Sequence, residues 1–372
     1  MKLNRLVALA LATALTATLA ACGGGSASTT AAPAAAPAET KAEAAAPEAA
    51  PADSAADYSS LEQTELILAD TAAAGAALQL FNEKFAANVD AITGGQLTLD
   101  YHGNGELGGD ADLLRHAQAE EIAIVGSQIA PVVPFVSQLA IFDLPMVFAK
   151  YDGDKIEAVL NGDSETRKAI DAAYEENDLH CLGFLQNATY RLTTSNPEIN
   201  DLASFKGLKI RTMENANHMA FWKAIGADPQ PLQWADVFFS LQTGAIDAEE
   251  NAADTVAGAN FQEVQKYIAC TNHILYCNQF CINKAIWEGL DPLYQQALMQ
   301  GFQMTLDEMR PQLAEIDKTK KAELQEKGMT LVEYEDSFYD EVLALPGVQD
   351  LYKEIDGKVG GLGTTLQEEL AK

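Results

Sequence analysis

The sequence predicts an α/β protein of two lobes that follow a separate N-terminal segment. About 310 of the 372 residues, from Leu61 onward, are rich in aliphatic and aromatic side chains, and this length exceeds what one hydrophobic core usually supports. Strand and helix patterns alternate along this part, which is typical of helices packed on the faces of a mainly parallel sheet. The alternation starts again near residue 188, where we expect the second lobe to begin.

The N-terminus predicts export and lipid anchoring. Met1 to Arg5 is basic, and an uncharged apolar run follows to Ala21, which is typical of a secretory signal and too short to span a bilayer. The run ends in "LAAC", with small residues directly before Cys22, as in a bacterial lipobox. We predict a lipoprotein signal peptide at 1–21 and a mature chain that is extracytoplasmic and held to the bacterial membrane only through lipidated Cys22. The alternative is an ordinary signal that happens to end beside a cysteine.

Residues 22–60 are predicted to form a tether. The stretch 23–57 is mostly alanine with four prolines and contains no Val, Leu, Ile, Met or aromatic residue. Such a composition cannot bury enough apolar surface to offset the entropy of ordering. We therefore expect a disordered segment that holds the folded body near the membrane.

In the first lobe, residues 65–70 (ELILAD) predict a buried opening strand. Apolar residues then recur at three- and four-residue steps from Leu78 to Ile92, which predicts an amphipathic helix ended by Gly94-Gly95. Residues 96–101 and 121–126 predict two more strands. A glycine-rich loop and a second helix lie between them.

In the middle of the chain, three strands and a helix are predicted before a long helical run. The strands are 181–187, 190–195 and 208–211, of which the first closes the preceding lobe, and the helix runs from Asn215 to about Ile225, where Gly226 stops it. The pattern from Ile286 to about Glu326 is helical. It is longer than one lobe needs, so it could bridge both.

Composition and missing motifs exclude several functions. With 54 acidic and 24 basic residues, the formal net charge is −30, which argues against nucleic acid or anionic lipid as a partner. The loop "GNGELGGD" lacks the Lys-Ser/Thr of a P-loop and has the wrong spacing for a dinucleotide site. No nucleophile or metalloprotease motif occurs. We therefore expect no enzymatic reaction and no cofactor.

The cysteines after Cys22 do not define a metal or disulfide framework. Four cysteines allow three disulfide pairings, and buried thiols are equally compatible with their apolar surroundings. Cys277, Cys281 and His273 lack a recognisable ligand spacing, so no metal site is predicted. The four are Cys181, Cys270, Cys277 and Cys281.

Two arginines suggest an anion site. Arg211 ends the predicted strand 208–211, and Arg191 opens the strand before it. Ligands of parallel α/β sheets bind outside the carboxyl ends of strands, and a guanidinium group binds a carboxylate through two charge-assisted hydrogen bonds. The alternative is a salt bridge to one of the many acids of this chain.

The segment that contains both arginines resembles the solute-binding subunits of TRAP (tripartite ATP-independent periplasmic) transporters, the DctP family. The resemblance covers most of the chain from about Leu66 to Tyr352, in order and with few gaps. No single motif is specific, but together they are. The matching motifs are "YRLTTSN", "GLKIRTMENAN" and "DAEEN", with "GELGGDADLL" and "FDLPMVF" before them.

The resemblance implies a periplasmic-binding-protein (flytrap) fold, in which two lobes joined by hinge strands and braced by a long helix close over an organic acid. The lobes would comprise residues 61–188 with about 277–316, and 189–276 with about 317–372. By position, Arg211 matches the arginine that clamps the ligand carboxylate. The other matching positions are Arg191, which commonly contacts the ligand, Asn251, which hydrogen-bonds it, and the pocket aromatics Trp234 and Phe238.

Some positions depart from the family pattern. The usual Gly, Gln and Pro are replaced here by Ala248, Glu249 and Ala252. The extra carboxylate of Glu249 leaves open the role of Glu250, which is a further site candidate. Gly126 stands where similar sialic-acid-binding members have an acid, which counts against sialic acid. Ser127 beside it is a candidate donor to a ligand oxygen. Glu106 of the glycine-rich loop is a weaker candidate.

The sequence therefore predicts an extracytoplasmic solute-binding lipoprotein that captures an organic acid. The resemblance implies that it delivers the acid to the small and large integral membrane subunits of a TRAP transporter. C4-dicarboxylates, sugar acids and keto acids all remain open as ligands. The alternatives are a sensor of the same fold that signals to a membrane kinase, and a surface lipoprotein with no transport role.

Overall fold

The computed structural model describes residues 56–372, which form one compact unit. The predicted signal peptide, Cys22 and nearly all of the tether lie outside the described residues, so those predictions stand untested. Among residues 56–372, no helix is long and apolar enough to cross a membrane.

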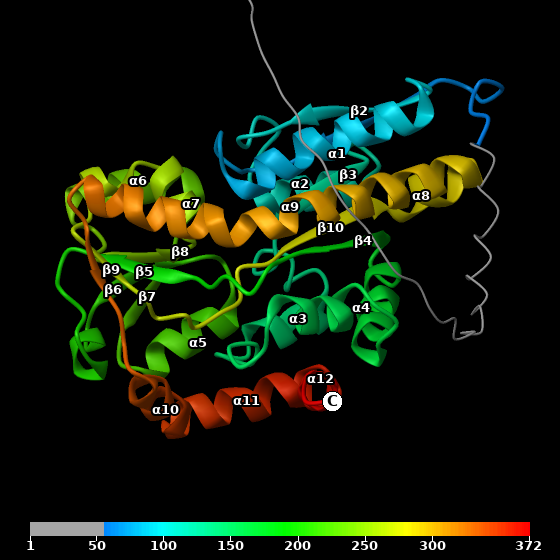
Figure 1. The fold of residues 1–372 in the computed structure, drawn as a ribbon. Coiled ribbons are helices and arrows are strands. Elements are labelled where there is room, and N and C mark those ends of the chain that lie inside the picture. Colours follow the sequence, from blue (N-terminus) through cyan, green and yellow to red (C-terminus); the bar gives the residue numbers. More distant parts are fainter. Residues whose placement is uncertain (1–55) are drawn as a thin grey trace, which may run out of the picture. The chain divides into compact units, whose positions relative to one another are not determined.

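The first lobe is built on a five-stranded sheet in the order β2-β1-β3-β10-β4 (Figure 1). Strands β1, β2 and β3 are parallel, as the alternating pattern predicted, but β10 is antiparallel to both β3 and β4. Four strands of this sheet therefore run in one direction, and β10 alone runs in the other, because it returns from the second lobe. The strands are β1 (Thr64–Ala69), β2 (Leu97–His102), β3 (Ile124–Gln128), β4 (Leu179–Leu185) and β10 (Asn278–Asn283).

Helices cover this sheet. The predicted first helix is confirmed as α1, which ends at Gly94, where a positive φ of 61° favours glycine. The helices of this lobe are α1 (Ala77–Thr93), α2 (Asp110–Gln118), α3 (Gly153–Leu160) and α4 (Glu165–Glu175), with the 3-10 helix η1 (Ser137–Asp143).

The second lobe contains a six-stranded sheet in the order β11-β9-β5-β8-β6-β7. Its centre is β5, antiparallel to β8 and β9, while β6 is parallel to both of its neighbours. The strands are β5 (Leu192–Ser195), β6 (Lys209–Thr212), β7 (Asp228–Pro231), β8 (Ala248–Asn251), β9 (Tyr267–Ala269) and β11 (Thr330–Val332). The helices are α5 (Ala216–Ala224), α6 (Trp234–Thr243) and α7 (Ala253–Gly258), with the 3-10 helices η2 (Leu202–Phe205) and η3 (Phe261–Glu263).

One long helix, α9 (Pro292–Glu326), runs along both lobes (Figure 1). It follows the short α8 (Lys284–Gly289) and contacts α1 and β4 of the first lobe and α7 and β11 of the second. The approach to α1 is close, since a Cβ at Gly301 would lie 2.8 Å from Val89 Cγ2. The predicted bridging helix is therefore present.

Three C-terminal helices contact both lobes. They are α10 (Asp336–Ala344), α11 (Pro346–Lys358) and α12 (Leu362–Leu370). Helix α11 packs against α5 and η1, and α12 packs against α3 and α4. The predicted residue boundaries of the two lobes stay a prediction. The three C-terminal helices, which the prediction assigns to the second lobe, contact both lobes.

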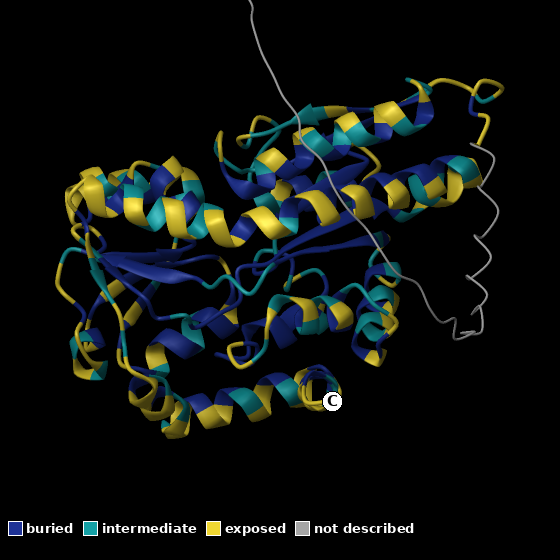
Figure 2. Ribbon diagram, viewed as in Figure 1, coloured by how far each residue is buried: buried dark blue, intermediate teal, exposed yellow. Residues whose placement is uncertain are grey.

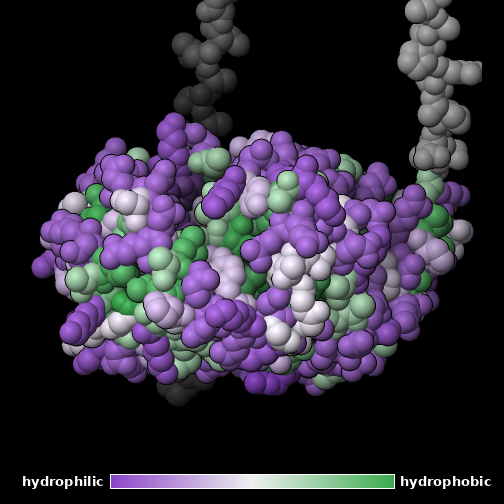
Figure 3. Space-filling model, turned by 90° about the horizontal axis from the view of Figure 1, so that it is seen from below, coloured by the Kyte–Doolittle hydropathy of each residue, from purple (hydrophilic) through white to green (hydrophobic). Residues whose placement is uncertain are grey.

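Both sheets are largely buried and the helices expose one side each (Figure 2). In the first lobe the core includes an aromatic group from α1, β10 and α9, with the Phe81 and Phe280 ring centroids 4.5 Å apart. The face that carries α10 to α12 is mostly hydrophilic, with hydrophobic residues showing in groups between the polar ones (Figure 3). This surface agrees with the strongly acidic composition.

Candidate functional site

A cavity lies at the carboxyl ends of strands from both lobes. Its inner part, about 50 Å³, is bounded by residues that follow β1, β3, β6 and β8, and it adjoins an outer cavity of about 510 Å³. Carboxyl strand ends are where open α/β folds bind ligands. The inner lining includes Thr71, Asp110, Gln128, Arg211, Trp234, Asn251 and Tyr276.

Arg211 is the cation of this cavity. It lies in β6, is 4% exposed, and donates from Nε to the carbonyl of Leu232 at 3.0 Å. Its guanidinium carbon lies 5.6 Å from the ring centroid of Trp234. Within residues 56–372, Arg211 has no salt bridge and no hydrogen bond from its two terminal nitrogens. Burial lowers the pKa of Arg211, although nearby acids oppose this shift.

Asp110 faces the same cavity from the first lobe. It is the first residue of α2, and its carboxylate accepts a hydrogen bond from Thr71 Oγ1 at 2.8 Å. Burial raises the pKa of Asp110, while Thr71 and the charge of Arg211 act in the opposite direction. Glu106 of the preceding loop, the weaker candidate, is exposed, and its side chain contacts His102.

Asn251 is held by two neighbours. Its Nδ2 donates to Glu249 Oε2 at 2.9 Å, and its Oδ1 accepts from Gln128 Nε2 at 3.4 Å. Because Asn251 donates to Glu249 through its amide nitrogen, its oxygen faces Gln128 and the cavity. The contact with Gln128 also joins the two lobes beside Arg211.

Arg191 and Glu250 pair with each other behind the cavity. Arg191 Nε donates to Glu250 Oε2, and Arg191 Nη1 donates to Gln128 Oε1. The pair is almost wholly buried, at 3% and 0% side-chain exposure. Neither residue lines the inner cavity, so Arg191 reaches it only through Gln128.

Two histidines complete this buried cluster around Glu250. His273 Nε2 lies 3.2 Å from Glu250 Oε2, and His218 lies 3.0 Å from Asp143 and 3.8 Å from Glu250. Burial would lower the pKa of His218, but Asp143 and Glu250 raise it to about 9. Burial would raise the pKa of Glu250, but Arg191 and the histidines hold it well below its usual range. The cluster is thus charged and internally compensated.

The remaining candidates lie away from the cavity. Ser127 is buried, accepts from Gln279 Nε2 at 2.9 Å and donates to the carbonyl of Gln128. Phe238 packs against Phe261, with ring centroids 6.4 Å apart. The structure therefore brings Arg211, Trp234 and Asn251 together, and places Arg191, Glu250, Ser127 and Phe238 behind or beside them.

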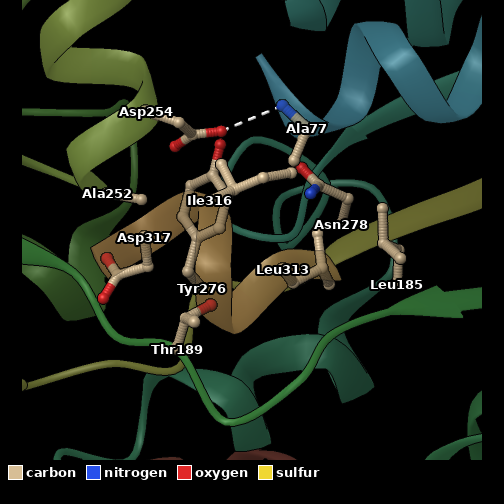
Figure 4. Close-up of a pocket in the computed structure, with 10 residues that line it drawn as sticks. All are labelled: Ala77, Leu185, Thr189, Ala252, Asp254, Tyr276, Asn278, Leu313, Ile316 and Asp317. Atoms are coloured by element: carbon tan, nitrogen blue, oxygen red, sulfur yellow. Dashed lines mark hydrogen bonds between the residues drawn. The ribbon is translucent and has the colours of Figure 1, made fainter. Parts of the chain in front are cut away.

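A second, smaller chamber lies under α9 (Figure 4). Its volume is about 20 Å³, enough for about one water molecule. Asp254 of α7 accepts a hydrogen bond there from the backbone N–H of Ala77, at the start of α1, at 2.9 Å. No arginine or lysine lines this chamber, so we place the anion site in the larger cavity.

The described part of the chain contains neither a cluster of metal-ligating side chains nor a disulfide. Residues 56–372 contain no group of three or more His, Cys, Asp or Glu side chains placed to hold a metal ion. The four cysteines in this range are free and buried. Of the two alternatives that the sequence allowed, disulfides or buried thiols, the structure has buried thiols.

Two α/β lobes, a long bracing helix and a cation in the cavity between strand ends define a two-lobed solute-binding protein. Residues 68–346 match the family described as bacterial extracellular solute-binding protein, family 7 (DctP), and the chain belongs to this family. The resemblance seen in the sequence is thereby confirmed.

Characterised relatives span several organic acids. The chain is 26% identical over 279 residues to the sialic acid-binding periplasmic protein SiaP of Vibrio cholerae, covering 74% of this chain and 83% of that protein. It is 34% identical over 187 residues to the 2,3-diketo-L-gulonate-binding periplasmic protein YiaO of Escherichia coli, covering 49% and 56%.

Solved structures confirm the two-lobed fold. The sugar acid binding protein DctPAm of Advenella mimigardefordensis, in complex with galactonate, matches with a TM-score of 0.77 at 21% identity, over 83% of this chain and 98% of that one. A TRAP periplasmic solute-binding protein of Roseobacter denitrificans with bound β-D-glucuronate matches with a TM-score of 0.74 at 22% identity, over 82% and 99%.

Sequence reasoning missed several cavity residues. Asp110 lies within the motif "GELGGDADLL", at the start of a predicted helix. A carboxylate at that position could have indicated a cavity residue. Gln128 and Tyr276 had no local signal, because their roles depend on which strand ends meet in space. The long-range pairing of β3 with β10 brings them together.

Proposed function

We propose that this protein captures an organic acid whose carboxylate binds Arg211. The observation that supports this most directly is a buried guanidinium group at a cavity wall with no salt bridge within residues 56–372. Burying a charge without a partner is costly. A ligand carboxylate would supply the direct partner that Arg211 lacks and accept two hydrogen bonds from its terminal nitrogens.

The lining favours a hydroxylated acid over a dicarboxylate. Asp110 lies in the same cavity as Arg211, so a second ligand carboxylate beside Asp110 would meet a like charge. Ligand hydroxyl groups, in contrast, would donate to Asp110 and to the oxygen of Asn251. The relatives that bind galactonate, β-D-glucuronate and 2,3-diketo-L-gulonate support a sugar acid as the ligand class. C4-dicarboxylates and simpler keto acids rank behind it.

Delivery and anchoring complete the proposal. We propose that lipidated Cys22 holds the protein on the outer side of a bacterial membrane, and that the closed lobes present the acid to the two integral membrane subunits of a TRAP transporter. Membership of the DctP family supports this. A sensor of the same fold is the second candidate, since the cavity would serve both roles equally.

A thermal-shift panel tests the proposal. The mature chain would be heated with galactonate, glucuronate, 2,3-diketogulonate, succinate, pyruvate and sialic acid. A ligand that binds only the folded protein adds about 2.7 kcal/mol of stability at a hundred times its dissociation constant. We expect a sugar acid to raise the melting temperature most.

Variants assign the effect to Arg211. We expect Arg211→Ala to weaken binding by about 30-fold to several thousand-fold, and Arg211→Lys not to restore it, because lysine lacks the planar fork. Arg167→Lys, on α4 and outside both parts of the cavity, is the matched control and should bind normally. Near-normal affinity in both Arg211 variants contradicts the proposal.

A further inference from the structure

Glu249 is a buried acid directly behind the proposed anion site. It lies in β8 with 0% exposure, and strand alternation places Glu249 and Asn251 on one face of the sheet and Glu250 on the other. Thr194 Oγ1 donates to Glu249 Oε1 at 2.9 Å, and Asn251 Nδ2 donates to Glu249 Oε2 at 2.9 Å. Both carboxylate oxygens are therefore occupied by neutral groups.

The charges around Glu249 do not balance once an anion is added. Arg211 faces it from the adjacent β6, and Glu250 lies next to it in β8 but is paired with Arg191. β5 contributes the neutral Thr194, and Asp110 of α2 lies beyond Arg211 across the cavity. With both acids ionised, Arg211 is the one cation shared by Glu249, Asp110 and the incoming carboxylate. The buried site would then carry an excess of negative charge.

The partners of Glu249 can accommodate a proton without rearrangement of the site. A threonine hydroxyl both donates and accepts, so Thr194 can rotate its hydrogen and accept from a protonated Glu249. The other oxygen of Glu249 continues to accept from Asn251. The amide of Asn251 then keeps its orientation toward the cavity in both states.

We propose that Glu249 takes up a proton from solvent when an organic anion binds at Arg211, so that anion capture is coupled to protonation of this acid. The inference rests on the proposed function.

The coupling has a defined sign. Burial raises the pKa of Glu249 to about 7, with Asn251, Thr194 and Arg211 acting against it. A bound anion raises this pKa further, so affinity is highest below about pH 7 and falls as pH rises above it. The fall is at most about tenfold per pH unit for one proton. Sugar acids themselves stay ionised across this range.

Calorimetric titration of the mature chain with D-galactonate and D-glucuronate tests this. Titrations at pH 6, 7 and 8, each in buffers of different ionisation enthalpy, count the protons taken up. We expect an uptake approaching one proton at pH 8 and an affinity that falls about three- to tenfold from pH 6 to pH 8. Glu249→Gln should take up no proton and lose the pH dependence, and Glu263→Gln, an exposed acid of the same lobe, should behave like the unmodified chain.

Three results would overturn the inference. Tight binding with no proton uptake contradicts it while leaving the proposed function intact. Uptake that disappears in Asp110→Asn assigns the proton to Asp110 instead, and this comparison holds even if Glu249→Gln does not fold. Absence of binding by any acid of the panel, at any of the three pH values, contradicts the proposed function and the inference with it.

Discussion

Two buried arginines in this protein have opposite surroundings. Arg191 is paired with Glu250 and bonded to Gln128, whereas Arg211 is bonded through one nitrogen to a carbonyl and faces a cavity. Their exposures are nearly equal, at 3% and 4%. Burial alone therefore does not identify the ligand-binding arginine. The absence of a salt-bridge partner within residues 56–372 distinguishes Arg211 from Arg191.

This contrast predicts different stability effects. Arg191→Met leaves Glu250 buried without its cation, so we expect the free energy of unfolding to fall by about 3–5 kcal/mol. Arg211→Met removes an unpaired buried charge and should change it by less than about 1 kcal/mol, or raise it. Urea denaturation of the ligand-free proteins measures both. Equal losses in the two variants would contradict the assignment.

The ion pair of His218 predicts a pH dependence of stability. The folded-state pKa of His218 is about 9 and lies above its ordinary value. The pair therefore stabilises fully below about pH 6.5, and this contribution is lost as pH rises through about 9. We expect this contribution to amount to about 3 kcal/mol, since one pKa unit corresponds to about 1.4 kcal/mol.

Denaturation between pH 6.5 and 9.5 checks this. His218→Gln should flatten the decline that the unmodified protein shows over this range. His116 lies in the last turn of α2 and is partly exposed, so His116→Gln should keep the decline. A decline that is the same in all three proteins would show that other groups cause it.

At the scale of elements, Asp254 links the two lobes through a helix end. Helix α1 has no side-chain cap of its own at Ala76, and Asp254 of α7 in the other lobe accepts from the N–H of Ala77 (Figure 4). A carboxylate at a helix N-terminus satisfies an unpaired donor and favours the helix dipole. This bond exists only while the lobes are together, so it should favour the closed form.

Removing this cap should weaken ligand binding without touching the ligand. Because a cap contributes about 0.5–2 kcal/mol, we expect Asp254→Ala to lower affinity about 2- to 30-fold. Asp152→Ala is the matched control, since Asp152 caps α3 from within one lobe. It should lower the melting temperature and leave affinity unchanged, and equal affinity losses in both variants would exclude a role in closure.

Local sequence patterns predicted the helices and strands better than they predicted which strands pair with each other. The periodicity from Leu78 to Ile92 predicted α1, and the short apolar runs predicted β1 to β6, because helix and strand periods are properties of contiguous residues. The antiparallel insertion of β10 between β3 and β4 was not predictable, because it depends on where the chain re-enters the first lobe. The same limit applies to the site. Arg211 ends a strand that the pattern predicts. The strand that carries Asn251, β8, was not predicted from the pattern, and Asp110 becomes a cavity residue only when the lobes meet.

In the whole molecule, we expect an N-terminal tether to hold a two-lobed binding protein that closes over its ligand. The 23–57 segment has no large apolar residue, so we expect it to give the body freedom to reorient near a membrane. With a formal net charge of −30, the body should not adhere to anionic lipid by itself. Attachment would then depend on the lipid at Cys22.

Membrane attachment is therefore predicted to require one side chain. Cys22→Ala should move the protein from the membrane fraction to the soluble extracytoplasmic fraction, and metabolic labelling with a fatty acid should disappear. A replacement within the tether, Ser26→Ala, is the control and should leave both unchanged. Persistent labelling of Cys22→Ala would contradict the lipobox assignment.

Arg211, a buried guanidinium without a salt-bridge partner in residues 56–372, is proposed to bind the ligand carboxylate. Calorimetric titration with D-glucuronate and with D-glucuronamide, which has the same ring and hydroxyl groups but no charge, tests this claim most directly. We predict that glucuronate binds, that glucuronamide binds at least about 30-fold more weakly, and that this preference disappears in Arg211→Ala. Equal affinity for the acid and the amide, or a preference for the acid that survives in Arg211→Ala, would contradict the claim.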